Sequence, residues 1–194
     1  MPDPTNPPDP ETDPDPDPIA ALHQAVDRLT RPLDVMHRDR LQCRRGCASC
    51  CVDDLTVFPV EADLIRRHHA PLLANEAPHP AGVCAFLDDQ GACRIYEHRP
   101  YVCRTQGYPL RWLDEADGDS LVELRDICPL NDDTGPPIEQ LPAEACWTLG
   151  PVEEQLARAQ YQAHGEASAR VRIRLRDLFA PGAETPRDAR HQGR

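Results

Sequence analysis

The stretch that decides the fold runs from Cys43 to Cys51 and reads Cys-Arg-Arg-Gly-Cys-Ala-Ser-Cys-Cys. Four of its residues are cysteines, in the order Cys-x3-Cys-x2-Cys-Cys. The Cys-x2-Cys step from Cys47 to Cys50 allows two thiolates to turn back toward one metal ion. Cys43 lies close enough upstream to supply a third ligand, and Gly46 relieves the backbone between them. Cysteines this dense do not suit a regular element, so we expect a metal-binding loop.

Cys51 is harder to place on the same ion as Cys50, because the side chains of adjacent residues diverge. It serves a second metal, bridges within a cluster, or packs as a buried thiol. Five further cysteines are spaced more widely: Cys84, Cys93, Cys103, Cys128 and Cys146. Two short apolar runs on either side of 88–92 predict a hairpin that brings Cys84 and Cys93 together. A short helix after it would return Cys103 to the same place.

The role that nine cysteines suggest depends on whether the protein lies in a reducing or an oxidising cellular compartment. The chain has no N-terminal apolar run like that of a secretory leader, and its apolar runs fall far short of the ~20 residues that cross a bilayer. We therefore expect a cytoplasmic protein with no membrane contact, whose cysteines act as metal ligands or redox thiols before they form disulfides. The alternative is that they are ordinary buried small side chains.

Composition excludes several classes of function. The formal net charge is −12, which argues against nucleic acid as a partner because binding phosphates needs a basic face. All 21 basic residues are arginines, so neither a Schiff-base lysine nor a P-loop lysine is available. Leu, Ile, Val and Phe are few, enough for a small core only. Bound metal would help to hold such a domain together.

Hydrophobic spacing predicts a mainly α fold with a small β-hairpin, an irregular α+β domain over 19–180 organised around a metal centre. Residues 1–18 are rich in proline and acidic residues and predict a disordered arm, and 181–194 predict a disordered tail. We expect helices at 19–36, 59–73, 100–106 and 151–179. Pro32 would kink or split the first of these helices, and Gly165 would interrupt the last.

Short strands are expected at 55–58 and 121–127, a polar turn at 114–120 and a loop at 131–142. The segment around 170–178 fits both an amphipathic strand and a helix. Helix-forming flanks favour the helix. In the first helix the apolar stripe consists of Ile19, Leu22, Val26, Leu29, Leu33 and Met36.

Three segments together resemble the YkgJ-like cysteine-cluster proteins, a family described as zinc- or iron-chelating and often labelled iron–sulfur. They are C-R-R-G-C-A-S-C-C, then C-A-F-L-x5-C-R-I-Y-E-H-R-P-Y-V-C-R, then C-P, within about residues 40–130. The resemblance implies eight metal ligands: Cys43, Cys47, Cys50, Cys51, Cys84, Cys93, Cys103 and Cys128. Cys146 lies outside the matched region. The family label names chelation and supplies no reaction.

Arg99 and Arg104 flank Cys103 and could offset the negative charge of a thiolate-rich site from the second shell of residues. An exposed pair of arginines explains them equally well. Three histidines are candidate imidazole ligands, although surface or capping roles are favoured because adjacent side chains cannot both face one site: His68, His69 and His98.

The leading hypothesis is a metal-binding protein that holds an iron–sulfur cluster or zinc, with a role in electron transfer or redox chemistry. A count near eight leans toward a cluster. A structural zinc module for contacts with an unidentified protein is the alternative. The spacing of Cys43, Cys47 and Cys50 also equals the radical S-adenosylmethionine signature, but a helix precedes it and few strand–helix units remain. No catalytic constellation is identified, nor a thioredoxin-like redox site.

Overall fold

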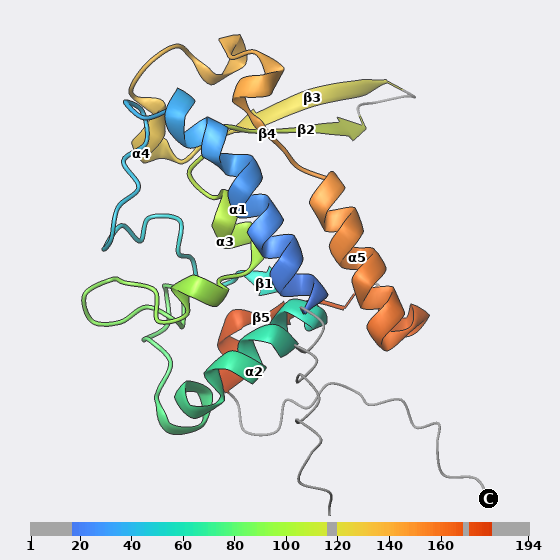
Figure 1. The fold of residues 1–194 in the computed structure, drawn as a ribbon. Coiled ribbons are helices and arrows are strands. Elements are labelled where there is room, and N and C mark those ends of the chain that lie inside the picture. Colours follow the sequence, from blue (N-terminus) through green and yellow to red (C-terminus); the bar gives the residue numbers. More distant parts are fainter. Residues whose placement is uncertain (1–16, 116–119, 169–170, 180–194) are drawn as a thin grey trace, which may run out of the picture.

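Three helices carry much of the core of the computed structural model, which describes residues 17–115, 120–168 and 171–179 (Figure 1). They are α1 (Pro18–Met36), α2 (Pro59–Asn75) and α5 (Pro151–His164). Asp17 caps α1, since its Oδ1 accepts hydrogen bonds from the N–H groups of Ile19 at 2.8 Å and Ala20 at 3.1 Å. The main apolar cluster includes residues of all three helices: Ile19, Val26, Leu33, Val60, Leu64, Val152 and Leu156.

The first helix differs from its prediction in two respects. It runs unbroken past Pro32, so the expected kink or split is wrong. Its buried face is also rotated from the predicted stripe: Leu29 and Met36 are exposed, whereas His23 and Thr30 are buried. A polar contact that the apolar pattern does not contain, described below, turns His23 inward.

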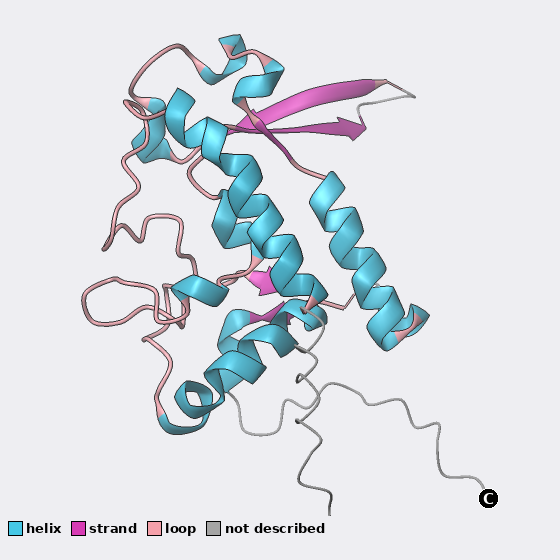
Figure 2. Cartoon of the chain, viewed as in Figure 1, coloured by secondary structure: helices cyan, strands magenta, loops and turns pink. Residues whose placement is uncertain are grey.

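The strands form two small sheets, drawn in magenta in Figure 2. In one, β1 (Thr56–Val57) pairs antiparallel with β5 (Ile173–Arg174). In the other, the central strand β2 (Leu110–Glu115) pairs antiparallel with β3 (Leu121–Asp126) and parallel with β4 (Trp147–Thr148). Together with the helices these sheets confirm an α+β fold.

Most predicted elements are present. The helices α2 and α3 (Tyr101–Thr105) and the strands β1 and β3 confirm the predictions at those positions. The segment 131–142 is less irregular than expected, because α4 (Pro129–Asp132) enters it and a 3-10 helix occupies Ile138–Gln140. Of the predicted polar turn, residues 116–119 lie outside the described residues.

The predicted helix beyond Gly165 is wrong. Helix α5 ends at His164, and the chain continues through the 3-10 helix Glu166–Ser168, strand β5 and a second 3-10 helix at Leu175–Phe179. Pairing with β1 decides this conformation, since the N–H of Leu175 donates to the carbonyl of Leu55 at 3.0 Å. The strand alternative for this segment therefore holds over its short central part.

The predicted arm and tail lie almost wholly outside the described residues. Only Asp17 and Pro18 of the arm are described, as the cap and first residue of α1. The first helix therefore begins one residue earlier than the predicted domain boundary. Among the helices of the described part, none has the length and apolarity that a bilayer span requires.

Candidate metal centre

The cysteine-rich segment Cys43–Cys51 is a loop, as its composition predicted. Two tight turns shape it: the N–H of Cys47 donates to the carbonyl of Arg44, and the N–H of Cys51 to the carbonyl of Ala48, both at 2.9 Å. Side chains in such a loop can rotate more freely than those held in a packed helix. All nine cysteines of the chain are free thiols.

The loop packs against the turn at 88–92 through two glycines. Gly46 and Gly91 both have positive φ, 84° and 73°. A Cβ on Gly91 would lie 3.3 Å from the carbonyl oxygen of Gly46, so this approach leaves little room for a side chain. In Figure 1 the two irregular segments lie on the same side of the molecule.

The predicted hairpin around this turn is reduced to a single antiparallel bridge between Leu87 and Cys93. Asp88 shapes the turn, because its Oδ1 accepts hydrogen bonds from the N–H groups of Gln90 at 2.9 Å and Ala92 at 2.8 Å. The backbone of the loop meets the hairpin again where the N–H of Cys84 donates to the carbonyl of Cys51 at 2.9 Å.

Asn131 ties a third segment to the loop. Its side-chain oxygen accepts from the N–H of Gln42 at 2.8 Å, and its Nδ2 donates to the carbonyl of Gly107 at 2.8 Å and to Cys43 Sγ at 3.5 Å. Its own N–H donates to the carbonyl of Cys128 at 2.8 Å. Asn131 therefore contacts Cys43 through its side chain and Cys128 through its backbone.

Sequence reasoning missed Asn131. The residue follows Cys-Pro-Leu, where an asparagine reads as an ordinary turn residue. The only signal was its position three residues after a predicted ligand. Three of its four hydrogen bonds depend on segments far away in the chain.

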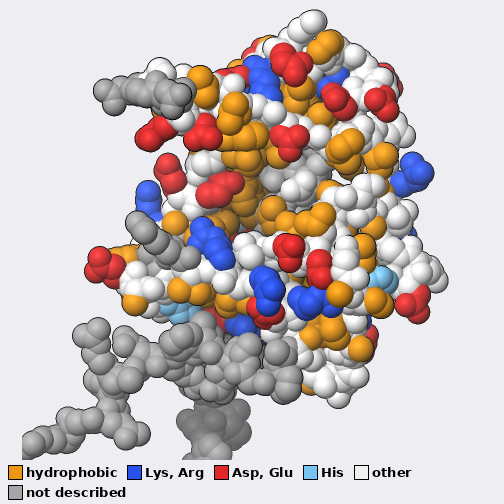
Figure 3. Space-filling model, turned by 180° about the vertical axis from the view of Figure 1, so that it is seen from behind, with side chains coloured by type: hydrophobic (Ala, Val, Ile, Leu, Met, Phe, Trp, Pro, Cys, Tyr) orange, Lys and Arg blue, Asp and Glu red, His pale blue; other side chains and the backbone are white. Residues whose placement is uncertain are grey.

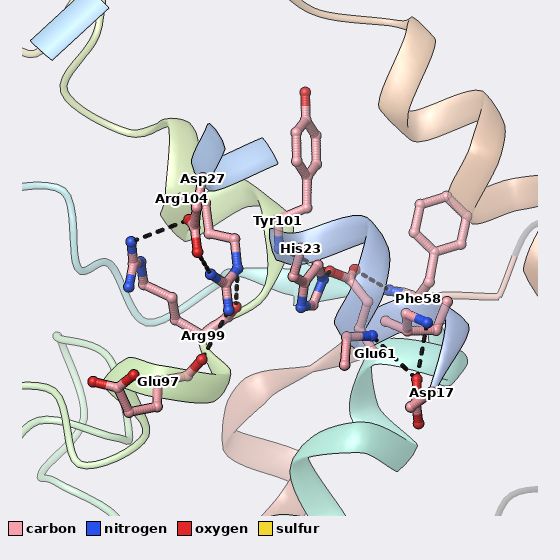
Figure 4. A network of polar contacts seen from close by, with 11 residues as sticks. Asp17, His23, Asp27, Phe58, Glu61, Glu97, Arg99, Tyr101 and Arg104 are labelled. Carbon is pink, nitrogen blue, oxygen red and sulfur yellow. Dashed lines mark hydrogen bonds and ion pairs between the residues drawn. The ribbon is translucent and has the colours of Figure 1, made fainter. Parts of the chain in front are cut away.

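Cys103 lies on the short helix α3, which a polar network fixes to α1 and α2 (Figure 4). Glu61 of α2 accepts hydrogen bonds on Oε1 from His23 Nε2 at 2.9 Å and from the N–H of Tyr101 at 2.8 Å. Arg104 forms an ion pair with Asp27 of α1 at 2.5 Å. The helix that carries Cys103 is thus anchored on both sides.

Neighbouring thiols add to the effect of burial on the pKa of Cys43 and Cys103. Burial raises the pKa of Cys43; a hydrogen bond from Asn131 opposes that shift, and the charges of Cys47, Cys50 and Cys128 add to it. Cys103 is the counterpart on α3. Burial raises its pKa most, followed by the charges of Cys84, Cys93 and Cys50.

Cys50 and Cys51 differ sharply although they are adjacent. A hydrogen bond between the two thiols lowers the pKa of Cys50 to about 6, against the opposing effect of burial. The same hydrogen bond, burial and the charges of Cys50, Cys84 and Cys103 raise the pKa of Cys51. The hydrogen bond therefore favours the thiolate form of Cys50 over that of Cys51.

Cys146 lies elsewhere. It packs in a separate small apolar cluster with Ile127, Ile138, Leu141 and Ala145. Burial raises its pKa, and the charged groups that influence it come from β2, β3 and Arg40. Cys146 therefore lies apart from the apolar cluster that contains Cys51, Cys84 and Cys93.

Arginines adjoin one part of this neighbourhood. Burial raises the pKa of Cys93 and Cys84, and arginine charges oppose this shift. The opposing charges are those of Arg99 and Arg94 at Cys93, and of Arg176 and Arg94 at Cys84. Arg94 and Arg176 were missed by the sequence analysis. Arg104 was a predicted second-shell cation, and its guanidinium donates to Asp27 and to the carbonyls of Arg99 and Glu97.

The three candidate histidines contact one another. The rings of His68 and His98 stack with centroids 3.9 Å apart, and His69 Nε2 lies 3.1 Å from His98 Nδ1. Burial and the neighbouring imidazoles lower the pKa of His69 and His98. The structure thus gathers these three residues into an imidazole cluster of their own.

The donor set fits iron or zinc, because thiolates are the ligands that zinc and iron–sulfur clusters share. As the side chains stand, no three His, Cys, Asp or Glu residues of the described chain converge closely enough to hold an ion. Binding therefore requires rotation of thiols about χ1, which the loop at Cys43–Cys51 permits.

Comparison with known proteins gives one match. Residues 42–129 match the family model CxxCxxCC, described as "Putative zinc- or iron-chelating domain". No curated protein and no solved structure matches the chain. The matched segment contains all eight of the predicted ligands and excludes Cys146. Residues 42–129 therefore belong to the CxxCxxCC family of zinc- or iron-chelating domains.

Proposed function

We propose that this protein chelates iron, as an iron–sulfur cluster, or zinc through eight cysteine thiolates, and that iron–sulfur binding serves electron transfer or redox chemistry. The proposed ligands are Cys43, Cys47, Cys50, Cys51, Cys84, Cys93, Cys103 and Cys128. One observation supports the proposal: contacts at Gly46, at Asn131 and between the backbones of Cys84 and Cys51 join segments far apart in sequence that carry these cysteines.

The chain prepares the thiols unequally for a metal. The hydrogen bond with Cys51 lowers the pKa of Cys50 and favours its thiolate form, so Cys50 would bind first. Burial raises the pKa of Cys84, Cys93 and Cys103, so these thiols give up protons only as metal binds. Arg94 and Arg99 would offset part of the thiolate charge. A bound iron–sulfur cluster would allow one-electron transfer, whereas bound zinc would hold the cysteine-bearing loops in one conformation.

The test is purification of the full chain without oxygen, followed by elemental analysis and a visible spectrum. Iron with sulfide and absorption in the visible range supports the cluster; zinc with no colour supports the zinc form. A folded, metal-free protein with nine titratable thiols would contradict both forms.

A structural zinc module for protein contacts is the second candidate. The β2–β3 hairpin favours it, because Leu113, Leu121 and Val122 are exposed at 59%, 63% and 40%. Figure 3 shows apolar side chains reaching the surface on this face of the molecule. Stoichiometric zinc with no redox activity would favour this candidate over electron transfer.

An enzyme of the radical S-adenosylmethionine type is not proposed. The described strands form two small sheets, β1–β5 and β3–β2–β4, rather than a barrel of alternating strands and helices. The spacing of the first three cysteines therefore stands without the fold that gives it that meaning.

A further inference from the structure

We infer that a C-terminal segment outside the matched residues 42–129 holds two of the proposed ligand loops together, and that Arg176 is its positioning residue. The segment runs over Ile173–Phe179 and is called the strap below. The two loops are those that carry Cys51 and Cys84. The inference rests on the proposed function, since it names what positions the same ligands.

The strap packs onto the apolar cluster that contains Cys84. Leu175 and Leu178 of the strap are members of this cluster, 2% and 5% exposed. The ring of Phe179 packs on that of Phe86, with centroids 4.9 Å apart. The strand at the start of the strap, β5, pairs with β1, just beyond the cysteine-rich loop (Figure 1). Burial of apolar side chains along its length fixes the strap in place, so a side chain between them has a defined position.

Arg176 lies between these buried side chains and bonds to both loops at once. Its Nε donates to Asp53 Oδ1 at 2.5 Å, two residues after Cys51. Its two terminal nitrogens donate to three carbonyls of the segment before Cys84, at 2.7, 2.9 and 3.3 Å: those of His79, Val83 and Pro80. A guanidinium suits this role because its planar fork carries five N–H donors.

Asp53 joins the same two loops from the other side. Its Oδ1 accepts from Arg176, and its Oδ2 accepts from the N–H of Gly82 at 3.0 Å. The backbones of the loops also meet directly, where the N–H of Cys84 donates to the carbonyl of Cys51 at 2.9 Å. The loops are therefore joined by a backbone bond and by a polar clamp, and the arginine of that clamp comes from the strap.

The clamp acts by geometry rather than by charge alone. A lysine at position 176 would keep a positive charge beside Cys84, but its single nitrogen cannot reproduce the spread of contacts that the guanidinium makes to Asp53 and the three carbonyls. Residues that orient metal ligands without touching the metal typically contribute about 10–100-fold to metal affinity. Arg176 should contribute in this range.

The experiment measures the zinc affinity of the full chain, without oxygen, by competition with a coloured chelator. Arg176→Gln should bind Zn²⁺ about 10–100-fold more weakly than the wild type, and Arg176→Lys should be weakened alike. Asp53→Asn breaks the other half of the clamp and should have a similar effect. Combining Arg176→Gln with Asp53→Asn should add little, because both changes remove the same contact.

Two controls separate positioning from other effects. Arg174→Gln lies on the same strap, where its exposed guanidinium bonds to Asp177, and it should bind zinc like the wild type. Leu156→Ala opens a cavity in the apolar cluster of α1, α2 and α5. It should destabilise the chain and leave the zinc affinity of the folded protein close to that of the wild type.

Three outcomes would overturn the inference. Wild-type affinity in Arg176→Gln would show that the clamp does not position the ligands. Restoration of full affinity by Arg176→Lys would show that charge alone suffices. Equal weakening in Arg176→Gln and Leu156→Ala would show that the strap acts through general stability.

Hydrogen exchange in the metal-free chain tests the strap apart from the proposed function. Arg176→Gln should raise exchange at the N–H groups of Gly82 and Cys84 while α1 and α5 stay protected. Unchanged exchange at both positions means that the strap does not hold the loops. A wild type that binds neither zinc nor iron contradicts the proposed function, and the exchange result then decides the strap by itself.

Discussion

At the scale of single residues, Asn131 is the polar side chain on which the geometry of Cys43 depends. It is 1% exposed, and its amide satisfies the N–H of Gln42 and the carbonyl of Gly107. Removing that amide would leave the buried carbonyl of Gly107 without this partner and would also free the N–H of Gln42. Such a loss costs about 1–3 kcal/mol for each unsatisfied group.

We therefore expect Asn131→Ala to destabilise the metal-free chain by about 1–3 kcal/mol and to weaken zinc binding, because Cys43 loses the side chain that contacts its thiol. Urea unfolding and zinc titration measure the two effects. The matched control is Asn75→Ala, whose exposed amide bonds only locally to the carbonyl of Pro71. An equal loss of zinc affinity in Asn75→Ala would show that the effect is not specific to Asn131.

The proposed cysteine ligands could be predicted from the sequence, but the residues that hold their segments in place could not. Cysteine is rare enough that eight in a matching pattern stand out, and the separation of Cys146 followed from the same pattern. Asn131 and the contact of Gly46 with Gly91 depend on partners 24 or more positions away. No local pattern marks such residues, because their types are those of any turn.

At the scale of elements, Glu61 joins three helices. Its carboxylate bonds to His23 of α1 and to the N–H of Tyr101 of α3, and it is itself 3% exposed on α2. A buried acceptor shared in this way explains why α1 turns His23 inward although its apolar spacing predicted Leu29. Satisfying a buried polar group outweighs the burial of one more leucine, since an orphaned donor is costly.

Glu61→Ala should therefore destabilise the chain by several kcal/mol, because it orphans His23 and the N–H of Tyr101 together. It should also lower zinc affinity, since α3 carries the proposed ligand Cys103. Thermal unfolding and zinc titration give the two readouts. The control is Glu154→Ala, an exposed position on α5, where a change below about 0.5 kcal/mol is expected. If Glu61→Ala leaves Tm unchanged, this network does not anchor α3.

The last helix shows where local prediction fails at this scale. The alternation of Val171, Ile173 and Leu175 suited strand and helix alike, and the flanks favoured the helix. In the structure Arg174 pairs with Thr56, and Arg172 lies over the ring of Phe58, 3.4 Å from its centroid. The exposed edge of β1 provided a pairing partner, which outweighs helix propensity.

At the scale of the whole molecule, the two main apolar clusters depend on the cysteines to different degrees. The cluster of α1, α2 and α5, with Leu64 and Leu156 at its centre, contains no cysteine among its described members. The second cluster contains Cys84 with Cys51 and Cys93 packed against it. The first cluster therefore packs without any proposed metal ligand, whereas the second cluster includes proposed ligands among its packed residues.

Metal removal should consequently act on the two parts unequally. Treating the metal-loaded chain with a chelator should raise amide hydrogen exchange in the loops at 42–55 and 76–95 well before exchange rises in α1 and α5, because only the loops lose ligand bonds. Far-UV circular dichroism should retain most of its helical signal. Hydrogen exchange read by mass spectrometry gives the segment-by-segment comparison, with Cys146→Ser as the control that should follow the wild type. Simultaneous exposure of α1, α5 and both loops would mean that the metal supports the helical core as well, so that the domain folds as a single unit around it.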